Sequence, residues 1–293
     1  MQKCDYCGRQ NQDAAAYCIG CGTPLAPEPS SWEPLVDQQA SEWILSAFRW
    51  ALEQFGSNIF YARTILVTPT PDHFPDKSGD PHELVALVFA RVRRYAGMEN
   101  WPCKLVAQES DVDPVIDRIT VIQNAPKAPG GTFSISGREQ PEVVITYNPA
   151  ALQRPQSLVA ILAHELAHYL GHTAGCPPPG GEKNWEHATD LLAVFLGFGL
   201  FLANSAVHFQ QFTGYNNQGW SSGALGYLSE FELVYCLAIF CTLKKIGRVQ
   251  VRSHLKSTLW PVYDNALTDL RRKGNVMSDL SCVNSVAKNR YEI

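Results

Sequence analysis

The eleven residues 162–172 read LAHELAHYLGH and lie in a segment with the apolar spacing of a helix. His164 and His168 are four residues apart, so a helix places both imidazoles on one face, where they can bind one metal ion. Glu165 follows the first histidine and can reach a water on that ion. The segment therefore predicts a helix that carries a metal site, with two hydrogen-bonded core histidines as the alternative.

A catalytic zinc ion is held by three protein ligands and lowers the pKa of a bound water to about 7. Glu165 would then be the general base. His172 is the next histidine in sequence, but eight residues along a helix separate it from His164 by roughly 12 Å. It could share the ion only if the helix broke at Gly171.

Two carboxylates follow in the next predicted helix. Glu186 comes 18 residues after His168, and Asp190 lies four residues further on the same helix face. Asp190 begins a very apolar run, in which an unpaired carboxylate would be costly. Metal-bound histidines usually donate their second N–H to a carboxylate, so Asp190 fits that role. His187 is a competing ligand, but it points about 100° away from Glu186 around the helix.

With H-E-x-x-H at 164–168 and E-x-x-x-D at 186–190, residues 142–246 resemble the gluzincin metallopeptidases. The resemblance implies that Glu186 is the third zinc ligand beside His164 and His168. It also implies that Asp190 orients His164 and that Glu165 is the catalytic residue. His172, His187 and Asp190 remain alternative third ligands. The implied activity is hydrolysis of a peptide or protein substrate.

Other features near this motif are ambiguous. Peptide hydrolysis needs an oxyanion stabiliser, and no motif distinguishes between the candidates Tyr169, His208, Tyr215 and Tyr227. Cys176 could cap the metal as a thiolate or be an ordinary cysteine. The β-prone run 141–149 is either an edge strand that holds extended substrate or an ordinary sheet strand.

The N-terminus carries a second metal motif. Two Cys-x-x-Cys pairs, each followed by glycine, supply the four thiolates of a tetrahedral zinc site: Cys4, Cys7, Cys18 and Cys21. So short a module cannot fold on apolar burial alone, so zinc binding would supply its folding free energy. Residues 1–25 resemble the zinc ribbons found at the ends of many prokaryotic proteins. Such a ribbon could bind a protein partner.

The expected domains are the ribbon at 1–25, a proline- and serine-rich linker at 26–34, and one α+β domain at 35–293. That domain is expected to be a compact gluzincin-like fold, with a small sheet and helices that carry the zinc site. Apolar patterning predicts the helices and strands. Helices are expected at about 35–55, 82–97, 155–171, 185–207, 228–246 and 249–273, and strands at 63–68, 103–108, 118–123 and 141–149.

Charge and composition limit the partners. The net charge is −4, which does not indicate a nucleic-acid partner. Residues 241–293 hold ten Lys or Arg against four Asp or Glu, typical of a solvated face or, less commonly, of a patch for a polyanion or membrane surface. The apolar run 191–207 is short for a membrane span and predicts a buried helix.

The chain has nine cysteines, which is an odd number, and those outside the N-terminus are scattered along the sequence. This distribution favours a reducing compartment. No secretory signal is visible, so we expect a cytoplasmic protein. The first functional hypothesis is a zinc metallopeptidase with one catalytic and one structural zinc. The second is a non-catalytic adaptor of peptidase-like fold that binds through the ribbon and the basic C-terminal region. A third is hydrolysis of a non-peptide amide.

Overall fold

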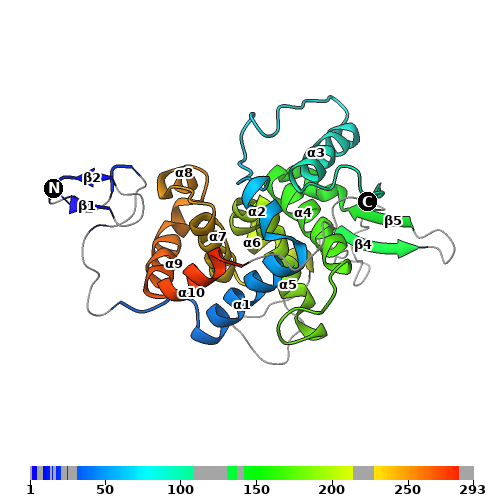
Figure 1. The fold of residues 1–293 in the computed structure, drawn as a ribbon. Helices are drawn as coiled ribbons and strands as arrows, with labels where there is room; N and C mark the ends of the chain where they lie inside the picture. Colours follow the sequence, from blue (N-terminus) through cyan, green and yellow to red (C-terminus); the bar gives the residue numbers. More distant parts are fainter. Residues whose placement is uncertain are drawn as a thin grey trace, which may run out of the picture.

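The structure is a computed structural model of the 293-residue chain (Figure 1). It describes residues 2–4, 9–13, 15, 18–20, 25, 32–108, 131–136, 142–213 and 228–283, with only the backbone of 135–136 and 207–213. These residues form helices and two small sheets, a mixture compatible with the expected α+β class. The strand predicted at 118–123 lies outside the described residues.

Helices make up most of the described chain. They are α1 (Gln38–Phe55), α2 (Ser57–Ala62), α3 (Pro81–Tyr95), α4 (Pro155–His172), α5 (Trp185–Ala193), α6 (Gly199–Thr213), α7 (Glu230–Leu243), α8 (Arg248–Arg252), α9 (Trp260–Arg272) and α10 (Gly274–Ser281). Shorter helical turns are η1 (Pro149–Gln153), η2 (Glu182–Asn184), η3 (Val194–Phe198) and η4 (Ser257–Leu259). The strands are β1 (Gln2–Lys3), β2 (Gln10–Asn11), β3 (Lys104–Ala107), β4 (Gly131–Ser136) and β5 (Glu142–Tyr147).

The larger sheet has the order β3-β5-β4, with β3 parallel and β4 antiparallel to β5. Alternate residues Val143, Ile145 and Tyr147 of β5 are buried, as the period of a strand requires. The strand expected at 141–149 is therefore confirmed, and of its two interpretations the ordinary sheet strand holds, because β5 is the central strand of the described sheet. The edge strands of the described sheet are β3 and β4, and the sequence patterns did not predict β4.

Helix α4 is the central element of the main body. Its residues 157–167 are all buried, which is typical of a helix surrounded by packing partners. It contacts α3, α5 and α6 and also strands β4 and β5. Figure 1 shows β4 and β5 on one side of α4, with α7 and α9 on the other side. The helix is thus held from several directions, which fixes the side chains that it presents.

The helix expected at 185–207 is interrupted at Gly197. This residue has φ of 103°, a left-handed conformation inside a π-helical turn between α5 and α6. Its carbonyl accepts a hydrogen bond from Val67 N at 3.0 Å. The strand predicted at 63–68 is wrong. Thr64, Ile65 and Val67 lie against the helix break at Gly197, and residues 64–68 enter neither described sheet.

The helix expected at 249–273 is also broken, into α8, η4 and α9. Buried Asn204 of α6 binds the chain at the break: its Nδ2 donates to His254 O at 2.8 Å, and its Oδ1 accepts from Lys256 N at 2.9 Å. Pro261 then stands in the first turn of α9, where its missing N–H costs nothing. These side-chain bonds replace the backbone bonds of a continuous helix.

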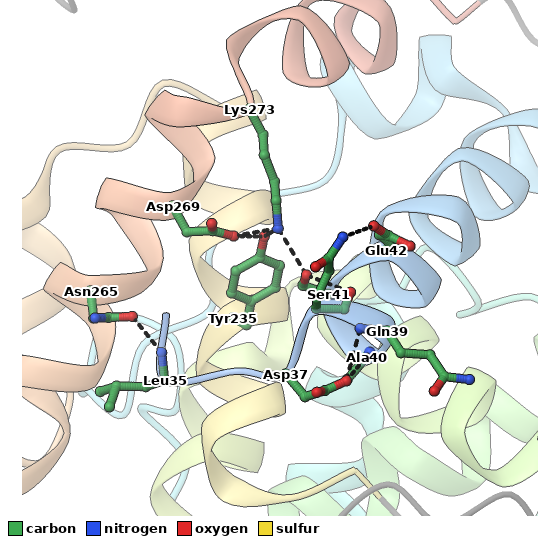
Figure 2. Close-up of polar contacts among 11 residues, drawn as sticks. Leu35, Asp37, Gln39, Ala40, Ser41, Glu42, Tyr235, Asn265, Asp269 and Lys273 are labelled. Atoms are coloured by element: carbon green, nitrogen blue, oxygen red, sulfur yellow. Dashed lines mark hydrogen bonds and ion pairs between the residues drawn. The ribbon is translucent and has the colours of Figure 1, made fainter. Parts of the chain in front are cut away.

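A buried polar cluster joins α1, α7 and the end of α9 (Figure 2). Tyr235 OH donates to Asp269 Oδ2 at 2.5 Å. Lys273 Nζ donates to the same carboxylate oxygen at 2.7 Å and to Ser41 Oγ at 2.8 Å. Burial and the Asp269 carboxylate both raise the pKa of Tyr235, so the phenol stays protonated and remains a donor. The cluster orients α7 relative to α1.

In the described chain the helical run Glu182–Ala206, which includes the break at Gly197, is long and apolar enough by length and composition to cross a membrane. Its most apolar window is entirely buried inside the protein. Phe198 and Phe201, for example, belong to the core. The expectation of a buried helix in this region is confirmed.

The break at Gly197 gives a stability prediction. A Cβ at this position would lie 2.1 Å from the carbonyl oxygen of Ile65, and φ is positive. We expect Gly197→Ala to lower the free energy of unfolding by at least about 2 kcal/mol. The measurement is urea denaturation of the purified chain. Gly274→Ala is the control, because nothing lies within 4 Å of its Cβ, and a change within about 0.5 kcal/mol is expected there.

Candidate metal centre

Helix α4 presents both histidines of the central motif to one point. His164 is buried and His168 is partly exposed, with ring centroids 4.7 Å apart. The helix begins at Pro155 and runs through His172 without a break, so His172 stays a full two turns beyond His164. Gly171 lets the indole of Trp185 approach, since a Cβ there would lie only 3.1 Å from that ring. The start of α5 thereby packs close to the end of α4.

Helix α5 supplies the third group. Oε2 of Glu186 lies 3.7 Å from His164 Nε2 and 3.5 Å from His168 Nε2. All three ligand atoms lie within 4.8 Å of one another, and they form a group that could hold a metal ion. Among the described residues, it is the one group of at least three His, Cys, Asp or Glu side chains whose ligand atoms lie this close together.

The donor atoms fit a small divalent cation. Oε2 of Glu186 is buried and has no hydrogen-bond partner among the described residues. Ligands of a tetrahedral zinc at 2.0 to 2.2 Å are separated by about 3.3 to 3.6 Å from one another, close to the two separations above. A buried carboxylate oxygen that faces two imidazoles without bonding them is explained by a cation between the three groups.

The charges of the site favour a cation as well. Burial alone would lower the pKa of His164, but its contacts with Asp190 and Glu186 outweigh burial and raise the pKa to about 10. Burial would raise the pKa of Glu186, yet the two histidines hold it well below its usual range. The pocket thus carries more negative charge than neutral imidazoles can balance. A proton or a metal ion can supply the missing positive charge.

Asp190 connects this group to a distant part of the chain. Its carboxylate is buried, and Oδ1 accepts the Nδ1–H of His164 at 2.9 Å. Its Oδ2 accepts from the backbone N of Leu228 at 2.9 Å. Leu228 precedes α7, whose start is fixed by a capping box between Ser229 and Glu232. With Nδ1–H bound to Asp190, His164 directs the lone pair of Nε2 at the shared point.

His168 has different neighbours. Oγ1 of Thr189 lies 3.4 Å from His168 Nδ1 and donates to Trp185 O at 2.8 Å. The ring of Phe133 stacks on the His168 ring, with centroids 6.2 Å apart and an angle of 10°. Thr189 and Phe133 were not singled out from the sequence. The spacing of Thr189, three residues after Glu186, was the available signal, because it places both on one helix face.

Glu165 lies between the three-ligand group, with which its carboxyl interacts electrostatically, and strand β4. Its side chain is buried, and burial raises its pKa. Gly131 lies against it: a Cβ there would be 3.0 Å from Glu165 Cγ, 2.7 Å from Ile161 Cγ2 and 2.9 Å from Thr146 O. Only glycine therefore fits between β4 and this part of α4.

The alternative ligands occupy other places. His172 is exposed, and its ring lies beside Phe133 at 6.4 Å. His187 packs edge-on against Trp43 of α1 at 5.9 Å, and burial lowers its pKa. Neither belongs to the group formed by the described ligand atoms. Asp190 contacts His164 through Nδ1, on the side opposite to Glu186.

Of the oxyanion candidates, the structure places one side chain. Tyr169 OH donates to Pro102 O at 3.3 Å, and its ring packs on Trp101 at 4.8 Å. That bond uses its hydroxyl proton, so Tyr169 is a poor candidate for this role. Tyr215, Tyr227 and the side chain of His208 lie outside the described residues.

The loop between the two ligand helices is held by α1. Trp43 Nε1 donates to Pro179 O at 2.8 Å, and Trp50 Nε1 donates to Cys176 O at 3.1 Å. Oε1 of Gln54 accepts from Gly175 N at 2.9 Å. The three side chains all belong to α1, and their hydrogen bonds fix the path of the loop from α4 to α5. No sequence pattern had connected α1 with the metal centre.

A cavity of about 440 Å³ opens beside His168. Its lining includes two aromatic rings and also Cys176, whose side chain is exposed. Polar and aromatic side chains of the lining are Phe133, His168, His172, Glu182, Trp185 and Thr189. Because His168 is shared, the cavity adjoins the three-ligand group.

At the N-terminus, β1 and β2 pair as a short antiparallel hairpin. Cys4 and Cys18 are both buried and pack together with Leu25. Gly20 N donates to Cys18 Sγ at 3.3 Å, the kind of bond that stabilises a thiolate. Cys7 and Cys21 lie outside the described residues, so the four-cysteine site remains a prediction.

Comparison of the chain with models of protein families, with curated proteins and with solved structures gave no match. The resemblance to gluzincins therefore depends on the residues of the site, and which metal ion the group could hold is a matter for proposal.

Asp190 gives a prediction on metal affinity. We expect Asp190→Asn to weaken zinc binding at the three-ligand group by about 10- to 100-fold, because the amide is a poorer acceptor for the Nδ1–H of His164. Competition against a chromophoric chelator measures the affinity. Asp76→Asn is the matched control, since that carboxylate pairs with Arg91 on α3. Unchanged affinity in the Asp190 variant would show that the bond does not tune the site.

Proposed function

We propose that this chain is a zinc-dependent metallopeptidase. The observation that carries the proposal is the convergence of His164, His168 and Glu186 within 4.8 Å, with Glu165 adjacent on the same helix. Structural zinc sites are usually closed by four protein ligands, whereas catalytic sites use three and keep one position open. Among the described residues the group has three members, which supports a catalytic site.

The roles of the residues follow from their positions. When bound, zinc supplies a Lewis acid that activates water and polarises a carbonyl group. His164, His168 and Glu186 would hold it, and Asp190 would keep His164 in the required tautomer. Glu165 would accept a proton from the attacking water and pass it to the leaving amine.

Substrate would lie along β4. This strand has one paired neighbour in the described sheet, β5, and Phe133 of β4 stacks directly on His168. An extended peptide can add to such an edge by backbone hydrogen bonding. The antiparallel pairing of β4 with β5 also brings Gly131 against Glu165, so the strand edge and the proposed base lie together.

The four N-terminal cysteines would form a separate structural zinc site in a ribbon that binds a protein partner. The burial of Cys4 and Cys18 and the bond to Cys18 Sγ support this part of the proposal. Thiolate ligands would be kept reduced in a cytoplasmic protein. The full chain would then bind two zinc ions, one in each site.

The first test uses the full chain with a peptide library and detection by mass spectrometry. We expect Glu165→Gln to keep both zinc ions and to lower the hydrolysis rate by at least about 100-fold, because the amide cannot accept the proton. His164→Ala should lose one zinc ion as well as activity. Zinc-loaded protein that cleaves no peptide would favour a non-catalytic adaptor, and cleavage only of small amides would favour an amidase.

Gly131→Ala tests the fit between β4 and Glu165. A Cβ would meet three neighbours at 3.0 Å or less, so either β4 or Glu165 must move. We expect zinc content to be retained and kcat to fall about 10-fold or more, since small displacements of a catalytic group are costly. Gly79→Ala is the control because its Cβ would meet nothing within 4 Å. An unchanged kcat in the Gly131 variant would show that β4 can move without disturbing catalysis, and would reject the proposed dependence of the base on the fit of this strand.

A further inference from the structure

The cavity beside His168 has two aromatic walls. Phe133 of β4 is held by stacking on His168. Trp185 lies over Gly171 and packs edge-on against Trp50, with ring centroids 5.8 Å apart. Neighbouring side chains on helices thus hold both rings in place. The cavity therefore does not need a ligand to order its aromatic walls.

One wall also carries a carboxylate. Oε2 of Glu182 accepts the indole N–H of Trp185 at 2.5 Å, which places the acid at the edge of the ring. A carboxylate can accept several hydrogen bonds, so this one leaves capacity for a ligand. Glu182 is exposed, and a ligand can reach it without disturbing the core.

The described lining of the cavity is acidic. Among its described residues Glu182 is the acidic one, and none is Lys or Arg. The imidazole of His172 and the hydroxyl of Thr189 can accept hydrogen bonds. A cation near aromatic faces is favoured by the ring quadrupoles, and a guanidinium can stack on a ring while it donates to a carboxylate.

We propose that this cavity is the subsite for a basic side chain of the substrate, with arginine preferred and Glu182 as the residue that determines specificity. This inference rests on the proposed function, since it assigns the cavity to the same substrate. The cavity adjoins His168, so a peptide that reaches the metal from β4 can place a neighbouring side chain between Phe133 and Trp185. Its volume of about 440 Å³ is large enough for an arginine side chain.

The test uses capped hexa-alanine peptides with one arginine moved through each position, and the same set with citrulline, its neutral isostere. For the full wild-type chain we expect a kcat/KM about fivefold or more higher for arginine than for citrulline at one position. Glu182→Gln should bring this ratio close to one. Glu182→Lys should reverse the preference, so that a glutamate peptide exceeds the arginine peptide.

Lys183→Gln is the matched control, because Lys183 is exposed, adjacent in sequence and absent from the cavity lining. It should leave the ratio unchanged. A wild-type ratio of one at every position, or a ratio that Glu182→Gln does not change, overturns the proposal. So does an equal loss in the Lys183 variant, which would indicate a general effect of surface charge.

A binding measurement separates this proposal from the enzymatic one. The same peptides are titrated into the full-length Glu165→Gln chain, and tryptophan fluorescence and calorimetry report binding. Tighter binding of arginine than citrulline, abolished by adding Glu182→Gln, supports the subsite even if the wild-type chain cleaves nothing. Peptide cleavage without any charge preference in either assay would leave the peptidase proposal in place and reject the subsite.

Discussion

The bond between Asp190 and His164 is the interaction on which the metal centre depends. Both side chains are buried, so neither could remain unpaired without a large cost. The other carboxylate oxygen of Asp190 binds the N–H of Leu228, which fixes the carboxylate from a second direction. Asp190 thereby links three helices: α5, which carries it, α4, which carries His164, and α7, which begins after Leu228.

This arrangement explains why so polar a group is found within a very apolar core. Residues around Asp190 in α5 and η3 are almost entirely buried and hydrophobic. In such surroundings a carboxylate is tolerated only when each oxygen has a partner. The two partners come from parts of the chain 26 and 38 residues away, so the polar group also restricts how these helices can pack.

Local patterns were sufficient to predict the elements that carry the ligands. Helix α4 and the placement of its two histidines on one face depend on residues within a few positions of one another. The proximity of Glu186 and Asp190 to this helix came from spacing combined with a family resemblance. Propensity and spacing therefore reached the two histidines, and the resemblance was needed to choose Glu186 and Asp190.

Contacts between distant segments were not predictable in this way. Gly197 occurs in a run that otherwise reads as a helix, and its break depends on Val67 and Ile65, more than a hundred residues earlier. The role of Gly131 depends on its approach to Ile161 and Glu165 of α4, which lie 30 and 34 residues further along the chain. The N–H of Leu228 carries no signal, because every residue except proline has one.

Helix α1 limits which fragments of the chain can keep the metal centre intact. It contributes none of the three ligand atoms, yet Trp43, Trp50 and Gln54 hold the loop that joins the two ligand helices. The segment between His168 and Glu186 is thus held in place by α1, which is neither of the two ligand helices. An excised fragment that began after α1 would keep every donor atom and lose the template that brings them together.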